Sequence, residues 1–274
     1  MTQPGSSTAQ AGADEGQYSL RTILLIWLAA VVPMVTLGWG ATGLVGDRLD
    51  LGVGYENREA FTRALFLTLG LIWQFVLVLL IVWREEGEVS WAAVKRRYRL
   101  NTPRDPKSGL PRPKLLWWLV PLIIAEGLLQ VVPLTALWEA AFPFLGEPAK
   151  YSFDEVVSSP ERKQALEGAW QILVLFIVLG LFNTVLGEEL LFRGILLPKM
   201  RGAFGKRDWL ANGVIFGLYH LHQPWSILGA IVDGALLYAL PSARFRSTWM
   251  GIAVHSGQTV FFIFLALGLV LGAA

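Results

Sequence analysis

The chain has 274 residues, of which 54% are hydrophobic and 16% are charged. Soluble domains usually carry about a quarter of charged residues, so this composition excludes an ordinary water-soluble protein and indicates a membrane protein. The formal net charge of +2 is too small to indicate a nucleic-acid partner. Because the chain has no cysteine, disulfides, thiolate metal ligands and a cysteine nucleophile are excluded as well.

The chain begins with a polar segment and continues with two long apolar segments. Residues 1–18 are rich in Gly, Ser, Gln and Ala and contain no Lys or Arg, which predicts a disordered tail that is not a secretory signal. The apolar segments run from about Leu20 to Val45 and from about Ala60 to Trp83. A helix of about 20 apolar residues crosses a hydrocarbon core ~30 Å thick, so each segment predicts one membrane span.

Charge in the polar connections predicts how the spans are oriented. Residues 84–114 contain nine Lys or Arg against four acidic residues, which by the positive-inside rule predicts a cytoplasmic loop that contacts anionic lipid headgroups. A third span is predicted from Leu115 to about Trp138, and the acidic stretch 139–167 then falls outside. The N-terminus is therefore expected in the cytoplasm, and residues 19–168 are expected to form a transmembrane scaffold.

The C-terminal half contains one long span, a broken segment and a final span. A helix is predicted from near Ala169 to Leu197, where Pro198 ends it. Residues 209–240 are apolar but interrupted by Pro224, and each piece of about 15 residues would be only ~23 Å long. Such short helices usually lie inside a bundle and line a cavity. With a last helix from Trp249 to about Leu271, we expect an all-α polytopic transmembrane bundle of about seven to eight helices, with residues 169–274 as its core.

Three ionisable residues lie close together in the long C-terminal span. Glu188, Glu189 and Arg193 each cost ~2.5–3.5 kcal/mol to insert in a membrane, so their presence needs a reason. Glu189 and Arg193 are four residues apart on one helix face, in the order that favours an ion pair, and are predicted to be structural. Glu188 is turned about 100° away from Glu189 and is left unpaired by this spacing.

All three histidines of the chain lie in the same apolar half. His220 and His255 lie ~14–20 Å from the nearest cytoplasmic basic residues along their helices, and Glu188 lies at a similar depth. Three helices are thus predicted to bring one carboxylate and two imidazoles to one level of the membrane. His222 faces another side of its helix and is expected to be structural or to lie at the rim of the site.

These residue types predict a hydrolytic site. A carboxylate with little water around it is a better base than one in solution, so Glu188 and His220 could activate a water molecule as nucleophile. His255 could donate a hydrogen bond to the oxyanion of a tetrahedral intermediate, supported by Gln258 or Thr259 three or four positions later on the same helix. No serine nucleophile is required.

Three other interpretations remain open at this stage. Glu188, His220 and His255 could hold zinc as two histidines and a carboxylate, although the usual HExxH pattern is missing, so no cofactor is the main expectation and zinc is the minority alternative. The same residues could form a buried polar network in a non-catalytic immunity or scaffold protein. Proton-coupled transport is less favoured because Glu126 and Asp233 are isolated in the sequence.

Three motifs in these segments resemble those of one family. The first is EExxxR, at residues 188–193; the second is FxxxH, at residues 216–220; the third is a histidine followed by a polar residue one helical turn later, at His255. In this order and in apolar segments they resemble the CPBP family, which contains the CAAX prenyl endopeptidases and their bacterial relatives and is also called the ABI family. The resemblance covers about residues 165–270.

The resemblance implies roles that agree with those reasoned from the residues. Glu188 and His220 would activate water and His255 would contribute to the oxyanion hole, so the candidate catalytic set is Glu188, His220 and His255, with Glu189 and Thr259 beside them. The chain departs from the family at Thr259, where the prenyl proteases have an asparagine.

The expected protein is a metal-independent, glutamate-dependent intramembrane endopeptidase. Its partners would be membrane lipids and a membrane-tethered peptide or protein substrate. The resemblance implies a multi-pass protein of a bacterial cell membrane, and the depth of the site predicts an active-site mouth on the cytoplasmic side. The residues indicate neither a substrate sequence nor an oligomeric state.

Overall fold

The structure, a computed structural model, describes residues 16–273, and the predicted tail lies outside this range up to residue 15. Within it the regular elements are all helical, with a single isolated β-bridge and no strand. Five helical segments are long and apolar enough to cross a membrane. They are Leu20–Val45, Tyr55–Glu86, Trp170–Lys199, Pro224–Phe245 and Trp249–Val270. The predicted all-α polytopic bundle is confirmed.

Two predicted segments differ from simple spans. The third span is a pair of helices, Pro113–Leu129 and Leu134–Ala141, which meet at a bend of 47°. Counting this pair as one span gives six. The helix α12 (Asp208–Tyr219) has only 12 residues, which is too short to cross a bilayer. With α12 the described segments number seven, in agreement with the predicted bundle of about seven to eight helices that includes short cavity-lining ones.

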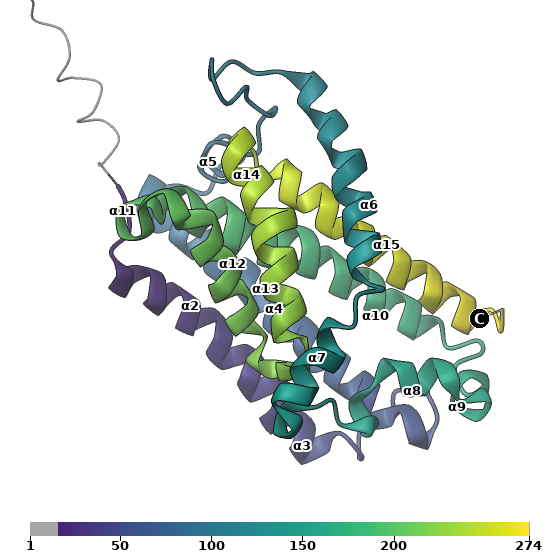
Figure 1. Cartoon of the computed structure of the whole chain (residues 1–274). Helices are drawn as coiled ribbons and strands as arrows, with labels where there is room; N and C mark the ends of the chain where they lie inside the picture. The colour runs from purple at the N-terminus through teal and green to yellow at the C-terminus, as the bar shows by residue number, and fades with distance from the viewer. Residues whose placement is uncertain (1–15, 274) are drawn as a thin grey trace, which may run out of the picture.

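The basic segments gather on one side of the bundle. The backbone amide of Thr248 donates to the Arg99 carbonyl at 3.1 Å, and that of Arg104 donates to Phe245 at 2.8 Å. Tyr18 donates to Lys199 in the same way, at 2.9 Å. In Figure 1 the helices α5 (Trp91–Arg97), α11 (Arg201–Phe204) and α14 (Leu240–Phe245) lie together at this end. We call it the basic side.

The stretch 139–167 lies at the opposite end, which we call the acidic side. It contains two short helices, α8 (Phe153–Ser158) and α9 (Pro160–Gln164), which lie at the same end of the bundle as α7 (Leu134–Ala141) and α3 (Thr42–Val45) in Figure 1. The Gly168 amide donates to Val270 at 2.9 Å, so the last span ends here too. The charge asymmetry read from the sequence is therefore an asymmetry between the two ends of the bundle.

The helix that carries the two glutamates departs from ideal α geometry around them. It begins as α10 (Trp170–Gly180) and passes through two π-helical stretches, Leu181–Gly187 and Leu190–Leu196. Such wide turns are frequent at functional sites. A Cβ at Gly187 would lie 2.4 Å from the Phe182 carbonyl oxygen of the same helix and 3.2 Å from the Leu71 carbonyl oxygen of α4 (Arg58–Glu86), so glycine suits both the wide turn and the close approach of the two helices.

The segment broken by Pro224 forms a helical hairpin with both ends on the basic side. It descends as α12, turns through His220–His222 and Pro224–Ser226, and returns through α13 (Ile227–Val232) and a π-helical stretch into α14. The two arms touch because Gly213 has no Cβ, which would lie 2.4 Å from Ala235. The turn is held by Trp39, whose Nε1 donates to the Leu221 carbonyl at 3.1 Å.

Candidate active site

Glu188 lies at the centre of the bundle, directly after the first π-helical stretch. It is only 2% exposed, and its Oε2 has no hydrogen-bond partner among the described residues. Its hydrogen-bonding neighbour is Tyr219 of α12, whose hydroxyl in turn accepts a bond from Gln74 of α4. The sequence predicted an unpaired Glu188, and the structure places it without a salt bridge.

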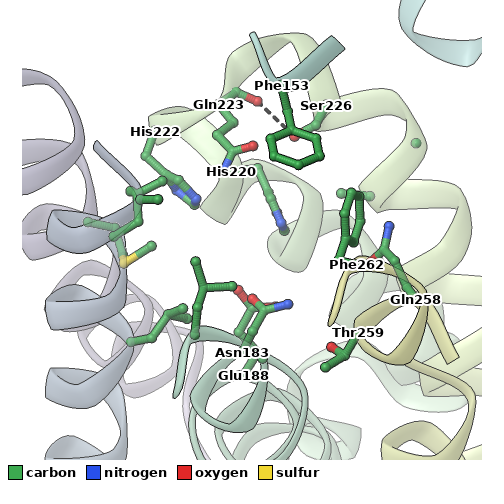
Figure 2. A pocket seen from close by; sticks show the side chains of 18 of the residues that line it. Phe153, Asn183, Glu188, His220, His222, Gln223, Ser226, Gln258, Thr259 and Phe262 are labelled. Carbon is green, nitrogen blue, oxygen red and sulfur yellow. Dashed lines mark hydrogen bonds between the residues drawn. The ribbon is translucent and has the colours of Figure 1, made fainter. Parts of the chain in front are cut away.

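A cavity of about 430 Å³ opens in front of this carboxylate. Its walls come from α4, α10, the hairpin, α15 (Trp249–Val270) and the stretch 139–167. Figure 2 shows Glu188 and Asn183 on one side of it and His220 on the other. His255, Gln258 and Thr259 line it as well, so the residues predicted to do the chemistry share one cavity.

His220 presents one ring nitrogen to the cavity. Its Nδ1 lies 2.9 Å from the Phe216 carbonyl oxygen, which can only accept a hydrogen bond, so Nδ1 carries the proton. The neutral ring then has its lone pair on Nε2, where it can accept a proton. His222 stacks on this ring at 5.4 Å between centroids and is buried, so it forms the wall behind His220.

His255, Glu189 and Arg193 form a buried chain of contacts. One oxygen of Glu189, Oε1, accepts from Arg193 Nη1 at 2.8 Å and contacts His255 Nδ1 at 3.1 Å. Arg193 also donates to the Gly234 carbonyl at 3.0 Å and lies over the Phe216 ring at 4.1 Å. Glu189 is therefore more than a partner for Arg193, because it also fixes the orientation of the His255 ring and directs its Nε2 away from the ion pair.

Glu126, which looked isolated in the sequence, supports His255 from a second direction. It accepts a hydrogen bond at 2.7 Å from the hydroxyl of Tyr238, and the Tyr238 ring stacks on His255 at 4.5 Å between centroids. The sequence analysis assigned no role to Tyr238. Only the fold reveals it, because Glu126, Tyr238 and His255 lie on three different helices.

Gln258 and Thr259, the two residues that could replace the asparagine of the prenyl proteases, have different surroundings in the structure. The Thr259 hydroxyl bonds to Thr184 at 3.3 Å, and its methyl group packs against Gly180. Gln258 lines the cavity, and its amide has no hydrogen-bond partner among the described residues. Asn183, which lines the same cavity as Glu188, offers a second amide that the motifs did not point to.

The cavity extends away from the basic side. Glu147, Tyr151 and Phe153 of the acidic side line its far end, together with Arg63 of α4, whereas no residue of 84–114, 199–207 or 244–246 lines it. The cavity lining therefore includes residues of the acidic side and none of these basic segments. The expectation of a cytoplasmic mouth stays a prediction, because counting depth along separate helices does not say toward which end the space between them extends.

The described residues do not form the ligand set that the zinc alternative requires. Among residues 16–273 no three His, Asp or Glu side chains are grouped so that they could hold one metal ion. The residues that the zinc set would need are therefore not arranged around a common point.

Taken together, the fold and the cavity define a polytopic helical membrane protein with a buried glutamate and two histidines around an internal space. Residues 169–261 match the family model described as type II CAAX prenyl endopeptidase, Rce1-like. The family suggested by the motifs is thus confirmed over about a third of the chain, and it indicates a protease-type enzyme. No curated protein matches the chain, and no solved structure does.

Proposed function

We propose that this protein is a metal-independent intramembrane endopeptidase in which Glu188 activates the attacking water. The observation that carries the proposal is that Glu188, His220 and His255 line one cavity and that Glu188 Oε2 has no partner among the described residues. A buried carboxylate oxygen without a donor costs free energy unless something binds to it. A water molecule that donates to it would satisfy this oxygen and place a nucleophile in the cavity.

The reaction follows from the orientation of the groups. Water donates one hydrogen bond to Glu188 and another to His220 Nε2, and its oxygen attacks the peptide carbonyl carbon. One proton passes to the Glu188–His220 pair as the tetrahedral intermediate forms. When the C–N bond breaks, this proton goes to the leaving amine, so that a carboxylic acid and an amine are the products.

The negative oxygen of the intermediate needs hydrogen-bond donors. His255 Nδ1 is held by Glu189, so the ring is oriented for an Nε2–H group to donate to the oxyanion. We assign the second donor to Gln258, because its amide lines the cavity whereas the Thr259 hydroxyl is bonded to Thr184. Arg193 stabilises Glu189 and does not itself reach the reaction.

The substrate we propose is a membrane-tethered peptide or protein that enters from the acidic side. With the basic segments in the cytoplasm, as the positive-inside rule favours, this entrance lies in the outer half of the membrane. The N-terminus is cytoplasmic in this orientation. The apolar side chains exposed on α2 (Leu20–Val35) and α15, such as Val32 and Phe264, would face lipid.

Replacement of Glu188 by Gln tests the proposal. The expected result is loss of a processed species from the membrane peptides of cells that carry the variant, with the amount and melting temperature of the protein unchanged. Glu161→Gln, at an exposed position of α9, is the matched control and should behave as wild type. Identical peptide profiles for wild type and Glu188→Gln would favour the non-catalytic interpretation, and loss of activity to a chelator would favour zinc.

A further inference from the structure

Arg63 is a buried cation at the far end of the catalytic cavity. It lies in α4, five residues after the helix begins, and is only 4% exposed. Its Nε donates to the Gly38 carbonyl at 3.3 Å, and its Nη2 donates to that of His222. Its guanidinium carbon lies 5.2 Å from the ring centre of Trp39. Arg63 also lines the cavity that contains Glu188.

The charge of Arg63 is not neutralised within the fold. Among the described residues no carboxylate forms a salt bridge with it, whereas the other two buried arginines, Arg97 and Arg193, pair with Glu85 and Glu189. Glu147 interacts with Arg63 through space and forms no salt bridge with it, and burial raises the pKa of the Glu147 carboxyl. Buried charges are normally paired, so Arg63 lacks the anion that its surroundings call for.

A purely structural role explains only part of this geometry. The two carbonyl contacts hold α4 to the hairpin turn, and the rings of Tyr151 and Trp225 complete an aromatic box at 4.9 and 5.1 Å. These contacts use Nε and Nη2, while Nη1 has no partner among the described residues. A guanidinium fixed on two sides and open on the third is well suited to bind a carboxylate.

The distance between Arg63 and the catalytic level sets the length of peptide that could join them. Gln74 bonds to Tyr219 beside Glu188, and the Leu71 carbonyl touches Gly187, so residues 71–74 of α4 mark that level. Arg63 lies eight to eleven residues earlier, which is ~12–17 Å along the helix axis. An extended peptide covers about 3.3–3.6 Å per residue, so about three to five residues bridge this distance.

We propose that Arg63, within the aromatic box of Trp39, Tyr151 and Trp225, is a binding subsite for a carboxylate of the peptide substrate, about three to five residues from the bond that is cut. This inference rests on the proposed function and adds to it a recognition site that the N-terminal scaffold supplies, outside the matched residues 169–261. The carboxylate is either the C-terminus of the peptide or an acidic side chain, which have the same chemistry.

The test measures peptide binding without cleavage, using the full-length Glu188→Gln protein in lipid nanodiscs. Fluorescent apolar decapeptides are compared in three forms: with a free C-terminal carboxylate, with a C-terminal amide, and with the amide plus one Asp near the C-terminus. We expect the carboxylate form to bind about tenfold or more tightly than the plain amide, as for a charged hydrogen bond. Restoration by Asp identifies a side-chain carboxylate as acceptable; no restoration identifies the C-terminus.

Two further variants assign the preference to Arg63. Adding Arg63→Gln should abolish the preference for the carboxylate peptide. Arg63→Lys should retain only part of this preference, because the compact ammonium group of lysine cannot bind two carbonyls and a carboxylate at once. Arg58→Gln is the matched control, since Arg58 lies on the same helix but pairs with Asp50 at 2.7 Å outside the cavity. The preference should survive in this control.

Three results would overturn the inference: equal affinity for the carboxylate and amide peptides, a preference that persists in Arg63→Gln, or no saturable binding of any carboxylate peptide. The comparison of peptides on the protein with Arg63 intact decides the question even where Arg63→Gln fails to fold. If binding shows the preference but protein with Glu188 intact cuts no peptide, the proposed function fails and the subsite stands.

Discussion

At the scale of single residues, the two adjacent glutamates have different surroundings. Glu188 faces the cavity with a free oxygen, while Glu189 is shared between Arg193 and His255. Spacing alone separated them, because neighbouring residues on a helix point about 100° apart. The contact of Glu189 with His255 was beyond the reach of spacing, since it joins two helices 66 residues apart in sequence.

The oxyanion partner gives a prediction at this scale. Gln258→Ala should lower kcat about a hundredfold, because loss of one oxyanion donor typically costs between a hundred- and a thousandfold. Thr259→Val should lower it less than about tenfold, because it removes only the 3.3 Å contact with Thr184 and keeps the shape that packs against Gly180. Steady-state kinetics on a processed substrate measure both. The reverse order of effects would assign the donor to Thr259.

At the scale of elements, the hairpin of α12, α13 and α14 builds the site. It delivers His220 at its turn and Tyr238 on its return arm, and it packs closely enough to do so because glycines lie where the arms cross. The sequence predicted two short cavity-lining helices from Pro224. Their close contact needed the structure, since a glycine in an apolar segment does not reveal which neighbour it touches.

Gly213→Ala tests this packing. The added methyl would lie 2.4–2.5 Å from the backbone and Cβ of Ala235, so the arms must separate, and we expect a loss of about 1–3 kcal/mol in stability together with lower activity. The melting temperature in detergent and the cleavage rate report the two effects. Gly43→Ala in α3, where nothing lies within 4 Å of the new carbon, is the control and should leave both unchanged. A Gly213 variant as stable as this control would show that the arms do not require their close approach.

At the scale of the whole molecule, the charge asymmetry and the position of the cavity oppose each other. The basic segments lie at one end and the cavity reaches toward the other, between the hairpin turn and the stretch 139–167. A site at mid-depth is compatible with a mouth on either side. The choice between them depends on where the hairpin turns and on which loop covers it.

The absence of cysteine makes the orientation directly measurable. Single cysteines at the exposed positions Ser108, on the basic side, and Ser158, on the acidic side, should differ in intact cells. Following the positive-inside rule, Ser158→Cys should react with a membrane-impermeant maleimide and Ser108→Cys only after permeabilisation. The opposite pattern would place the cavity mouth in the cytoplasm.

The sequence by itself determined the class of the fold, the spans and the polar residues that meet in the core. It could do so because apolar length and the cost of buried charge are local properties that a bilayer enforces on every segment. Tertiary structure alone decided that Glu189 orients His255, that Tyr238 links Glu126 to the site, that the cavity reaches toward the acidic side, and that Arg63 lies in it. These features depend on contacts between helices that are distant in sequence. For the position of Arg63 the sequence contained one signal, which is that this charged residue lies three residues into the second apolar segment.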